Sequence, residues 1–277
     1  PMVRSISLLV GLFFTVGLAW SFVNGAITTA QEGLPTSVEK QFHKKPRELH
    51  LASDGAFGKF DNQQLQRGFQ VYKEVCAACH GLKFVALRDL AALGYNEDEV
   101  KALAASFNVP GIDPNTGEAT SRPGLPTDQF PSPFANDIAA RAANNNAVPP
   151  DLSLITKARP NGAAYVYSLL VGYQNPPANL PKDNQPGPGL HYNPYFPNLN
   201  LAMAPPLSGE GQVTYAEGNP RPTVDQMAKD VTAFLVWTAE PSLTKRKQSG
   251  WPVLGFLLFA TILGYMAYRN VWADKKH

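Results

Sequence analysis

The chain has 277 residues, with 24 basic and 22 acidic side chains and a formal net charge of +2. Charged residues make up only 17% of it, and no basic cluster is interleaved with aromatic residues, so nucleic acid is not an expected partner. The sequence contains neither a phosphate-binding glycine loop nor a Ser/His/Asp arrangement of recognisable spacing. With 25 prolines and 22 glycines, much of the fold is expected to be loop and turn.

The first 30 residues form an apolar leader. Arg4 precedes an uncharged run that begins at Ile6 and fades by Val23, and small residues follow it up to Ala30. A basic residue, a short apolar core and then small residues are typical of an export signal. About 18 apolar residues also approach the length of a membrane-spanning helix, so a retained N-terminal span is the alternative.

A helix is predicted to precede residue 76. Leu65, Phe69, Tyr72 and Cys76 are spaced by four, three and four residues, which places their side chains on one face of a helix. The C-terminal end of this helix is expected to present the residues that follow Cys76 to a bound cofactor.

Residues 76–80 read Cys-Ala-Ala-Cys-His, the attachment signature of a c-type haem. The thiols of Cys76 and Cys79 can each bond one vinyl group of a porphyrin, and His80 is then an axial ligand of the iron. A zinc site normally needs four Cys or His ligands, but the chain has only these two cysteines. A thioredoxin-like dithiol accompanies a βαβ pattern, which is not visible here. The motif therefore predicts one covalently attached haem c.

Three more helices are predicted, two of them from capping signals. Asn96 is followed by acidic residues, with Glu99 placed to complete a capping box, and Thr223 has Gln226 in the same position. Proline-rich connections cover residues 110–133 and 175–222, and few strand patterns appear, so the fold class is predicted to be mainly α, with long ordered loops wrapped around one cofactor. The three helices are expected from Asn96, from Asn161 to about Gly172, and from Thr223 to about Glu240.

The C-terminal region predicts a transmembrane anchor. No charge occurs over the 18 residues from Trp251 to Tyr268, which is about 27 Å of helix. Basic residues precede and follow this run, and aromatic residues stand near its ends. We therefore divide the chain into a leader at 1–30, a haem domain at 31–244, and an anchor with a short cytoplasmic tail at 245–277.

The haem motif predicts the side of the membrane on which the domain lies. Covalent haem attachment takes place outside the cytoplasm, so residues 31–244 are expected in the periplasm. This region has 17 basic and 21 acidic side chains, a net charge of −4 that mildly favours a basic soluble partner.

The second axial ligand is open between two candidates on spacing alone. Met203 lies between small residues and is followed by two prolines, which can hold a thioether against iron at low entropic cost. His191 is the alternative. His43 and His50 lie in a charged stretch, and Met227 is expected to pack on an apolar helix face. The remaining candidates belong to the terminal segments: Met2, Met266 and His277.

Six blocks in order carry a resemblance to a known family. They are residues 76–81 (CAACHG), 140–145 (ARAANN), 148–153 (VPPDLS), 193–197 (NPYFP), 203–207 (MAPPL), and 228–231 with 239–241 (AKDV and AEP). Together they resemble the cytochrome c1 family, the haem subunits of cytochrome bc1 complexes, in its proteobacterial form. The similarity spans roughly residues 39–270.

The resemblance implies a complete set of haem-binding residues. In it Met203 joins His80 as the second iron ligand, and Arg159 lies near a haem propionate, where a guanidinium would form charge-assisted hydrogen bonds. The competing interpretation of Arg159 is an ordinary surface arginine. For the residues that would line the haem pocket, Asn144, Pro149, Pro150 and Tyr165, it is packing alone. Some family members stiffen the methionine side with a disulfide, for which this chain has no further cysteine. The implied cofactor-binding residues are Cys76, Cys79, His80, Met203, Arg159, Asn144, Pro149, Pro150 and Tyr165.

The resemblance also implies a function. The chain would act as the electron-relay subunit of ubiquinol–cytochrome c reductase, taking an electron from the mobile Rieske iron–sulfur protein and passing it to a soluble c-type cytochrome. It would have no catalytic residue of its own, and would sit beside cytochrome b in a dimeric complex of a bacterial inner membrane. The alternatives are a membrane-anchored haem c subunit of another dehydrogenase or terminal oxidase, a haem enzyme such as a peroxidase, and an anchored structural protein.

Overall fold

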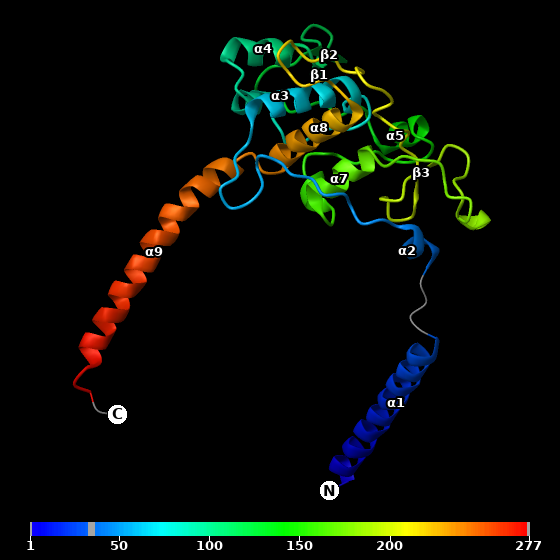
Figure 1. Cartoon of the computed structure of the whole chain (residues 1–277), viewed down its shortest axis with the longest axis vertical. Helices are drawn as coiled ribbons and strands as arrows, with labels where there is room; N and C mark the ends of the chain where they lie inside the picture. Colours follow the sequence, from blue (N-terminus) through cyan, green and yellow to red (C-terminus); the bar gives the residue numbers. More distant parts are fainter. Residues whose placement is uncertain (1, 33–36, 276–277) are drawn as a thin grey trace. The chain divides into compact units, whose positions relative to one another are not determined.

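The computed structural model describes residues 2–32 and 37–275, which fold into a mainly helical chain with long connections, as predicted (Figure 1). The chain divides into two compact units, Pro1–Phe42 and His43–His277. Of the predicted regions, residue 1 of the leader, residues 33–36 of the haem domain and residues 276–277 of the tail lie outside the described residues.

The first unit contains α1 (Met2–Glu32) and the short α2 (Val38–Phe42). Within α1, Val3–Ala30 is long and apolar enough to cross a membrane, and its described side chains are exposed. An export signal and a retained membrane span both fit this helix.

The second unit holds the predicted haem domain and the C-terminal helix. Its elements in chain order are α3 (Asn62–Val71), the π-helical segment η1 (Tyr72–Cys76), the 3₁₀ segment η2 (Leu87–Leu93), α4 (Glu97–Ala105), β1 (Asn108–Ile112), β2 (Ala119–Pro123), α5 (Asp137–Ala143), α6 (Ile155–Ala158), α7 (Gly162–Leu170), the 3₁₀ segment η3 (Lys182–Asn184), β3 (His191–Tyr192), β4 (Asn200–Leu201), α8 (Val224–Ala239) and α9 (Leu243–Trp272).

The core is built around α3 and α8, which lie side by side in Figure 1. Their backbones approach so closely at Gly68 that a Cβ there would lie 2.0 Å from the Asp230 carbonyl oxygen. Beside this crossing, Arg67 donates to both carboxylate oxygens of Asp230, at 2.9 and 3.2 Å. The ion pair is buried, and Gln64 and Gln226 also donate to Asp230, so its charge is well satisfied.

Aromatic side chains fill the space between these helices and their neighbours. Phe69 of α3 packs against Phe234 of α8 with ring centroids 5.7 Å apart, and Tyr72 of η1 contacts the same ring at 5.7 Å. Phe130, from the loop after β2, joins both Phe69 and Tyr72 in edge-to-face contacts. Because such pairs add to simple area burial, this cluster fixes η1 against the core.

The helix starts agree only partly with the capping predictions. The capping box of α4 is confirmed, since Asn96 accepts from the Glu99 amide and Glu99 accepts from the Asn96 amide. Thr223 caps α8 by accepting from the Gln226 amide at 3.1 Å. The second half of that predicted box is wrong, because the Gln226 side chain turns to Asp230 instead.

The proline-rich connections contain short strands that the sequence pattern did not reveal. β1 and β2 form an antiparallel hairpin in the first connection, and β3 pairs with β4 in the second, with His191 opposite Leu201. The second hairpin lies directly before residue 203.

The C-terminal helix starts earlier than the apolar run. The uncharged run begins at Trp251 and the predicted anchor region at residue 245, whereas α9 begins at Leu243 and includes the basic residues 245–247 and Pro252. Lysine and arginine are good helix formers, so they extend the helix rather than interrupt it. α9 is long and apolar enough to span a membrane, and none of its apolar window is buried in the described structure.

Candidate functional site

The Cys-x-x-Cys-His motif is delivered by the π-helical segment η1. The Ala77 amide donates to the Tyr72 carbonyl five residues earlier, at 2.8 Å, which defines the wider turn. The amides of Cys79 and His80 then both donate to the Cys76 carbonyl, at 3.1 and 2.9 Å. Single π turns inside helices are frequent at functional sites. Here the turn ends the helix and places all three motif side chains within one tight loop.

The His80 ring is oriented by a contact from a distant segment. Its Nδ1 lies 2.7 Å from the carbonyl oxygen of Pro150, 70 residues further along the chain. When Nδ1–H donates to this carbonyl, the lone pair of Nε2 is left for a metal, the arrangement by which proteins orient metal-binding histidines. Burial lowers the pKa of His80 below its ordinary value, which favours the neutral imidazole that binds metal.

The segment around Pro150 is itself tied to the chain after the motif. Asp151 accepts from the amides of Lys83, at 2.8 Å, and Ser153, at 3.0 Å. The Leu152 amide donates to the Gly81 carbonyl at 2.9 Å. Residues 80–84 and 150–153 therefore form one hydrogen-bonded unit, which holds the Pro150 carbonyl against His80.

The two thiols suit covalent attachment better than the competing chemistries. Cys76 and Cys79 are free and half-buried. Burial, and secondarily the nearby Cys79, raises the pKa of Cys76 to about 12, whereas a redox dithiol needs a thiolate. Among the described residues, no group of three or more His, Cys, Asp or Glu side chains could hold a metal ion, which also disfavours a zinc site.

Met203 lies in a loop held between two buried leucines. Leu201 precedes it and Leu207 follows it, and both side chains are buried. The hydroxyl of Tyr173 donates to the Met203 carbonyl at 3.0 Å, which ties the loop to the chain just beyond α7. Met203 itself is half-buried.

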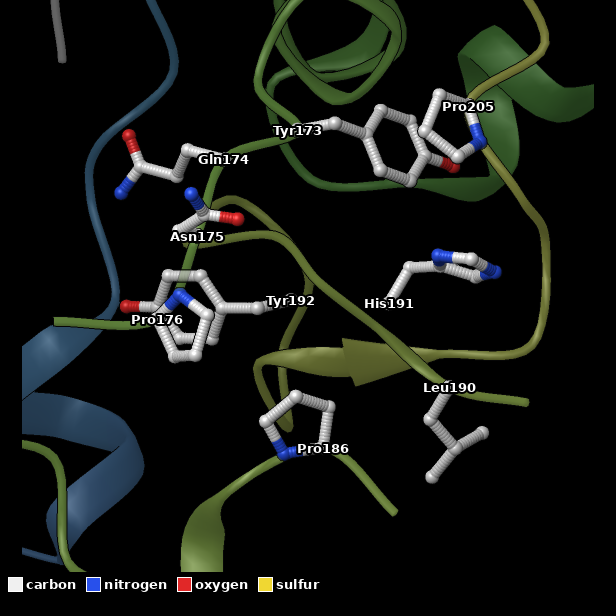
Figure 2. A pocket seen from close by; sticks show the side chains of 9 residues that line it. All are labelled: Tyr173, Gln174, Asn175, Pro176, Pro186, Leu190, His191, Tyr192 and Pro205. Carbon is white, nitrogen blue, oxygen red and sulfur yellow. The ribbon is translucent and has the colours of Figure 1, made fainter. Parts of the chain in front are cut away.

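A cavity of about 470 Å³ adjoins this loop. Figure 2 shows the ring of Tyr173 directed toward Pro205, with His191 in the same part of the cavity. His191 and Pro205 of the methionine loop thus line the same cavity. The cavity is lined by Tyr173, Gln174, Asn175, Pro176, Pro186, Leu190, His191, Tyr192 and Pro205, and so it belongs to the methionine side rather than to the cysteine side.

The predicted pocket residues fall into two groups. Arg159 and Tyr165 are neighbours: burial raises the pKa of the Tyr165 phenol, and the adjacent Arg159 guanidinium partly offsets this. Arg159 is exposed and donates to the Ala158 carbonyl at 3.1 Å. Tyr165 is buried and also lies close enough to Tyr173 to raise the pKa of that phenol, after the larger effect of burial.

The second group lies on the segment after α5, whose Pro150 carbonyl contacts the His80 ring. Asn144 is half-buried at the end of α5, and its side chain donates to the Ala140 carbonyl at 2.7 Å. Pro149 is half-buried beside Pro150, whose carbonyl faces the His80 ring. The structure therefore assigns Pro150 a contact through its backbone rather than through its ring.

Sequence reasoning missed two tyrosines that support the predicted ligands. The hydroxyl of Tyr72 donates to the His80 carbonyl at 2.8 Å, and that of Tyr173 donates to the Met203 carbonyl. Tyr72 is fully buried in the core. The position of Tyr72 on the predicted helix face indicates only that its side chain points inward. No local signal marks Tyr173, which precedes its partner Met203 by 30 residues.

The donor set fits a c-type haem. Two free thiols and an imidazole with a fixed Nδ1 contact stand in one loop, and a half-buried thioether stands in another. These are the groups that attach and ligate such a cofactor.

Comparison with known proteins points the same way. The model of the cytochrome C1 family matches residues 51–275. A Rhodospirillum rubrum protein named cytochrome c1 is 47% identical over 235 residues, which cover 80% of this chain and 86% of that protein. An Arabidopsis thaliana protein named cytochrome c1 1, heme protein, mitochondrial, is 46% identical over 224 residues, covering 80% of this chain and 71% of that protein.

A third relative is much longer than this chain. A Bradyrhizobium diazoefficiens protein named cytochrome b/c1 is 45% identical over 241 residues. The match covers 79% of this chain but 34% of that protein, so this chain is similar to about a third of it.

Proposed function

Because the chain belongs to the cytochrome c1 family and is thus a haem-carrying electron-transfer subunit of a cytochrome bc1 complex, we propose that it carries one covalently bound haem c. In this proposal it takes single electrons from a Rieske iron–sulfur protein and passes them to a soluble c-type cytochrome. The cofactor supplies a one-electron iron couple, and the chain contributes attachment, ligands and orientation.

The observation that carries this proposal is the geometry of His80. Its Nδ1 faces the Pro150 carbonyl at 2.7 Å, which supports Nε2 as the iron-binding atom. Cys76 and Cys79 stand in the same loop and would form the two thioether bonds. The proposed haem contacts further along the chain are Met203, Arg159, Asn144, Pro149, Pro150 and Tyr165.

Met203 is proposed as the second ligand. A thioether opposite an imidazole stabilises the reduced iron and raises its potential. With His80 and Met203 both bound to it, the iron would have no position open to a reactant. This arrangement suits electron transfer and disfavours a peroxidase.

The partners and location follow from the family and from α9. We propose that α9 anchors the chain in a bacterial inner membrane beside cytochrome b, within a dimeric complex, with the haem domain at 31–244 in the periplasm. The name of the cytochrome b/c1 relative joins the two subunits in one protein. The net charge of −4 over residues 31–244 would favour a basic acceptor cytochrome.

Haem attachment is tested by denaturing gel electrophoresis with haem staining. The chain should keep its haem colour through the gel, and the double variant Cys76→Ser with Cys79→Ser should lose it, because that variant can form neither thioether. Ser242→Ala, outside the proposed site, is the matched control and should stain normally. A colourless unmodified chain would refute the proposal.

Co-purification separates this proposal from a haem c subunit of another dehydrogenase or oxidase. Gently solubilised membranes should yield the chain together with a cytochrome b and a Rieske protein, and the preparation should reduce a soluble c-type cytochrome with ubiquinol as donor. Recovery with a different set of redox subunits would support the alternative.

The anchor is tested by ending the chain after Gly250, which retains Leu243, buried against the haem domain. We expect a soluble, haem-bearing protein in the periplasmic fraction. If the shortened chain still sediments with membranes, then α1 is a retained span and the leader is not a cleaved export signal.

A further inference from the structure

The first turns of α9 are hydrogen-bonded to a loop of the haem domain, residues 51–60, which we call the clamp loop. The ammonium of Lys247 donates to the carbonyls of Ser53, at 2.7 Å, and Gly55, at 2.6 Å. The Phe60 amide donates to the Thr244 hydroxyl at 3.1 Å. Charge-assisted bonds of this kind are strong, so the loop and the first turns of α9 form one unit.

The clamp loop is also fixed internally. The Leu51 amide donates to the Asp54 carboxylate at 2.8 Å, and the Lys59 amide donates to the Ala52 carbonyl at 2.9 Å. Gly58 fits so tightly that a Cβ would lie 1.9 Å from the Asp54 carbonyl oxygen. The position of the loop tip is therefore set by the backbone.

This rigid tip presents an exposed aromatic side chain. Phe57 is 80% exposed, yet its ring stacks on Trp251 with centroids 5.1 Å apart and an interplanar angle of 17°. Trp251 is the first residue of the uncharged run of α9, and Val253 and Leu254 beyond it are also exposed. The phenyl ring is thus continuous with the apolar surface of the helix that would enter the bilayer.

We propose that the clamp loop is a second membrane contact, in which Phe57 and Trp251 lie together at the boundary between the lipid headgroups and the acyl chains. Tryptophan is enriched at this level because its ring is apolar while its indole N–H is polar, and the ring of Phe57 stacked on Trp251 extends the apolar part of that surface. Lys59, two residues beyond Phe57, is exposed and suits the headgroup layer.

The proposal explains why the loop is so firmly built. A single helix entering a membrane would leave the haem domain free to tilt about its base. A second contact at Phe57, rigidly joined to α9 through Lys247, fixes that tilt and hence the height of the haem site above the membrane. The inference rests on α9 spanning the membrane, but not on the identity of the electron donor or acceptor.

The test measures the depth of a nitroxide spin label at position 57. The full chain with its haem, carrying Phe57→Cys, is labelled and reconstituted in vesicles of phosphatidylcholine and phosphatidylglycerol. Collision with oxygen, which concentrates in lipid, is compared with collision with a water-soluble nickel chelate. Ile112→Cys in β1 is the water reference, since Ile112 is an apolar residue that is 74% exposed, and Leu257→Cys marks the apolar span.

We expect the label at 57 to prefer oxygen over nickel several-fold more than the label at 112, and less than the label at 257. Equal behaviour at 57 and 112 would overturn the proposal. So would poor collision with both reagents at 57 in the assembled complex, because that pattern means coverage by another subunit. A label at 257 that meets nickel freely would show that α9 does not span, and would remove the basis of the inference.

A second variant tests the clamp itself. Lys247→Met removes both hydrogen bonds to the loop while keeping a long side chain, so the label at 57 should gain motion and lose part of its preference for oxygen. Lys245→Met, one position from the helix face that meets the loop, is the control and should change neither. These measurements do not depend on electron transfer: normal depths in a chain without redox activity would refute the proposed function alone.

Discussion

The two sides of the proposed haem site are built in different ways. On the histidine side, α3, η1 and the motif are consecutive in the sequence. Residues 150–153 hold the motif loop through several hydrogen bonds. On the methionine side, Met203 lies in a loop between a two-residue strand and a proline-rich segment, and is tied to the end of α7 through Tyr173. A cavity of about 470 Å³ adjoins that side.

The difference suggests separate tasks for the two sides. The histidine side is continuous with the aromatic core, so it is expected to open only with global unfolding. The methionine loop has no disulfide to stiffen it, because the two cysteines of the chain belong to the motif. We therefore expect changes on the methionine side to alter iron ligation, and changes behind the histidine side to alter stability. The following predictions run from the largest expected effect to the smallest.

Met203→Leu should give the largest change. Losing the thioether should lower the midpoint potential by a few tenths of a volt, since axial ligand choice spans about 0.8 V, while the haem stays attached. Redox titration measures the shift, and carbon monoxide should then bind the reduced iron. His191→Leu is the control for the competing ligand: a large shift there, with an unchanged potential in Met203→Leu, would transfer the assignment to His191.

Asp230→Asn should cost stability without changing iron ligation. It leaves the buried guanidinium of Arg67 without its counter-charge, which typically costs about 3–5 kcal/mol. Thermal unfolding followed by circular dichroism should show a clearly lower midpoint, with a normal potential in the protein that is folded. Lys229→Met breaks an exposed ion pair on the same helix and should change the midpoint little. Equal effects of the two variants would contradict the picture of a rigid scaffold behind His80.

Tyr72→Phe tests the histidine side with a single atom. It removes the 2.8 Å hydrogen bond to the His80 carbonyl, so the free energy of unfolding should fall by about 1 kcal/mol. Because the Pro150 contact still orients the ring, carbon monoxide binding should stay at the level of the unmodified protein. Denaturant unfolding and a carbon monoxide titration measure the two quantities, and a rise in carbon monoxide binding would show that the histidine side is less rigid than proposed.

Tyr173→Phe is the matched change on the methionine side. It removes the 3.0 Å bond to the Met203 carbonyl, again worth about 1 kcal/mol, but in a loop outside the α3–α8 core. Here the cost should appear as easier displacement of the thioether, with more carbon monoxide bound and a smaller loss of global stability than in Tyr72→Phe. The opposite ranking of the two variants would invert the comparison.

Glu240→Gln should have the smallest effect and touch neither side. Hydrogen bonds from Lys157, and then Arg246, hold the pKa of Glu240 below its ordinary value of 4.5. Because the folded-state pKa is depressed, this carboxylate contributes stability that is present above about pH 4.5 and is lost as the pH falls through the lowered pKa. Glu240→Gln should flatten that part of the acid stability profile between pH 5 and 3. An altered midpoint potential in this variant would count against its independence from the haem site.

Much of the fold could be predicted from local sequence patterns, and where the structure differs from these predictions the reasons are also local. The capping box at Asn96 formed as predicted because its donors and acceptors lie within three residues of each other. The one at Gln226 failed because a buried carboxylate, Asp230, offered a better acceptor one turn further on. The uncharged run begins eight residues after the first residue of α9, because such a run marks the part of a helix that can enter a membrane and not the start of the helix.

The sequence by itself determined the chemistry: which residues can attach and ligate a haem, and which segments are apolar enough to cross a membrane. Those properties depend on neighbours along the chain. Only the tertiary structure decided what holds the chemistry in place. Pro150 meets His80 across 70 residues, Tyr173 meets Met203 across 30, and Lys247 meets Ser53 across 194. Packing of the whole core sets such partners, because every residue has a backbone carbonyl and the sequence does not show which side chain will bond to it.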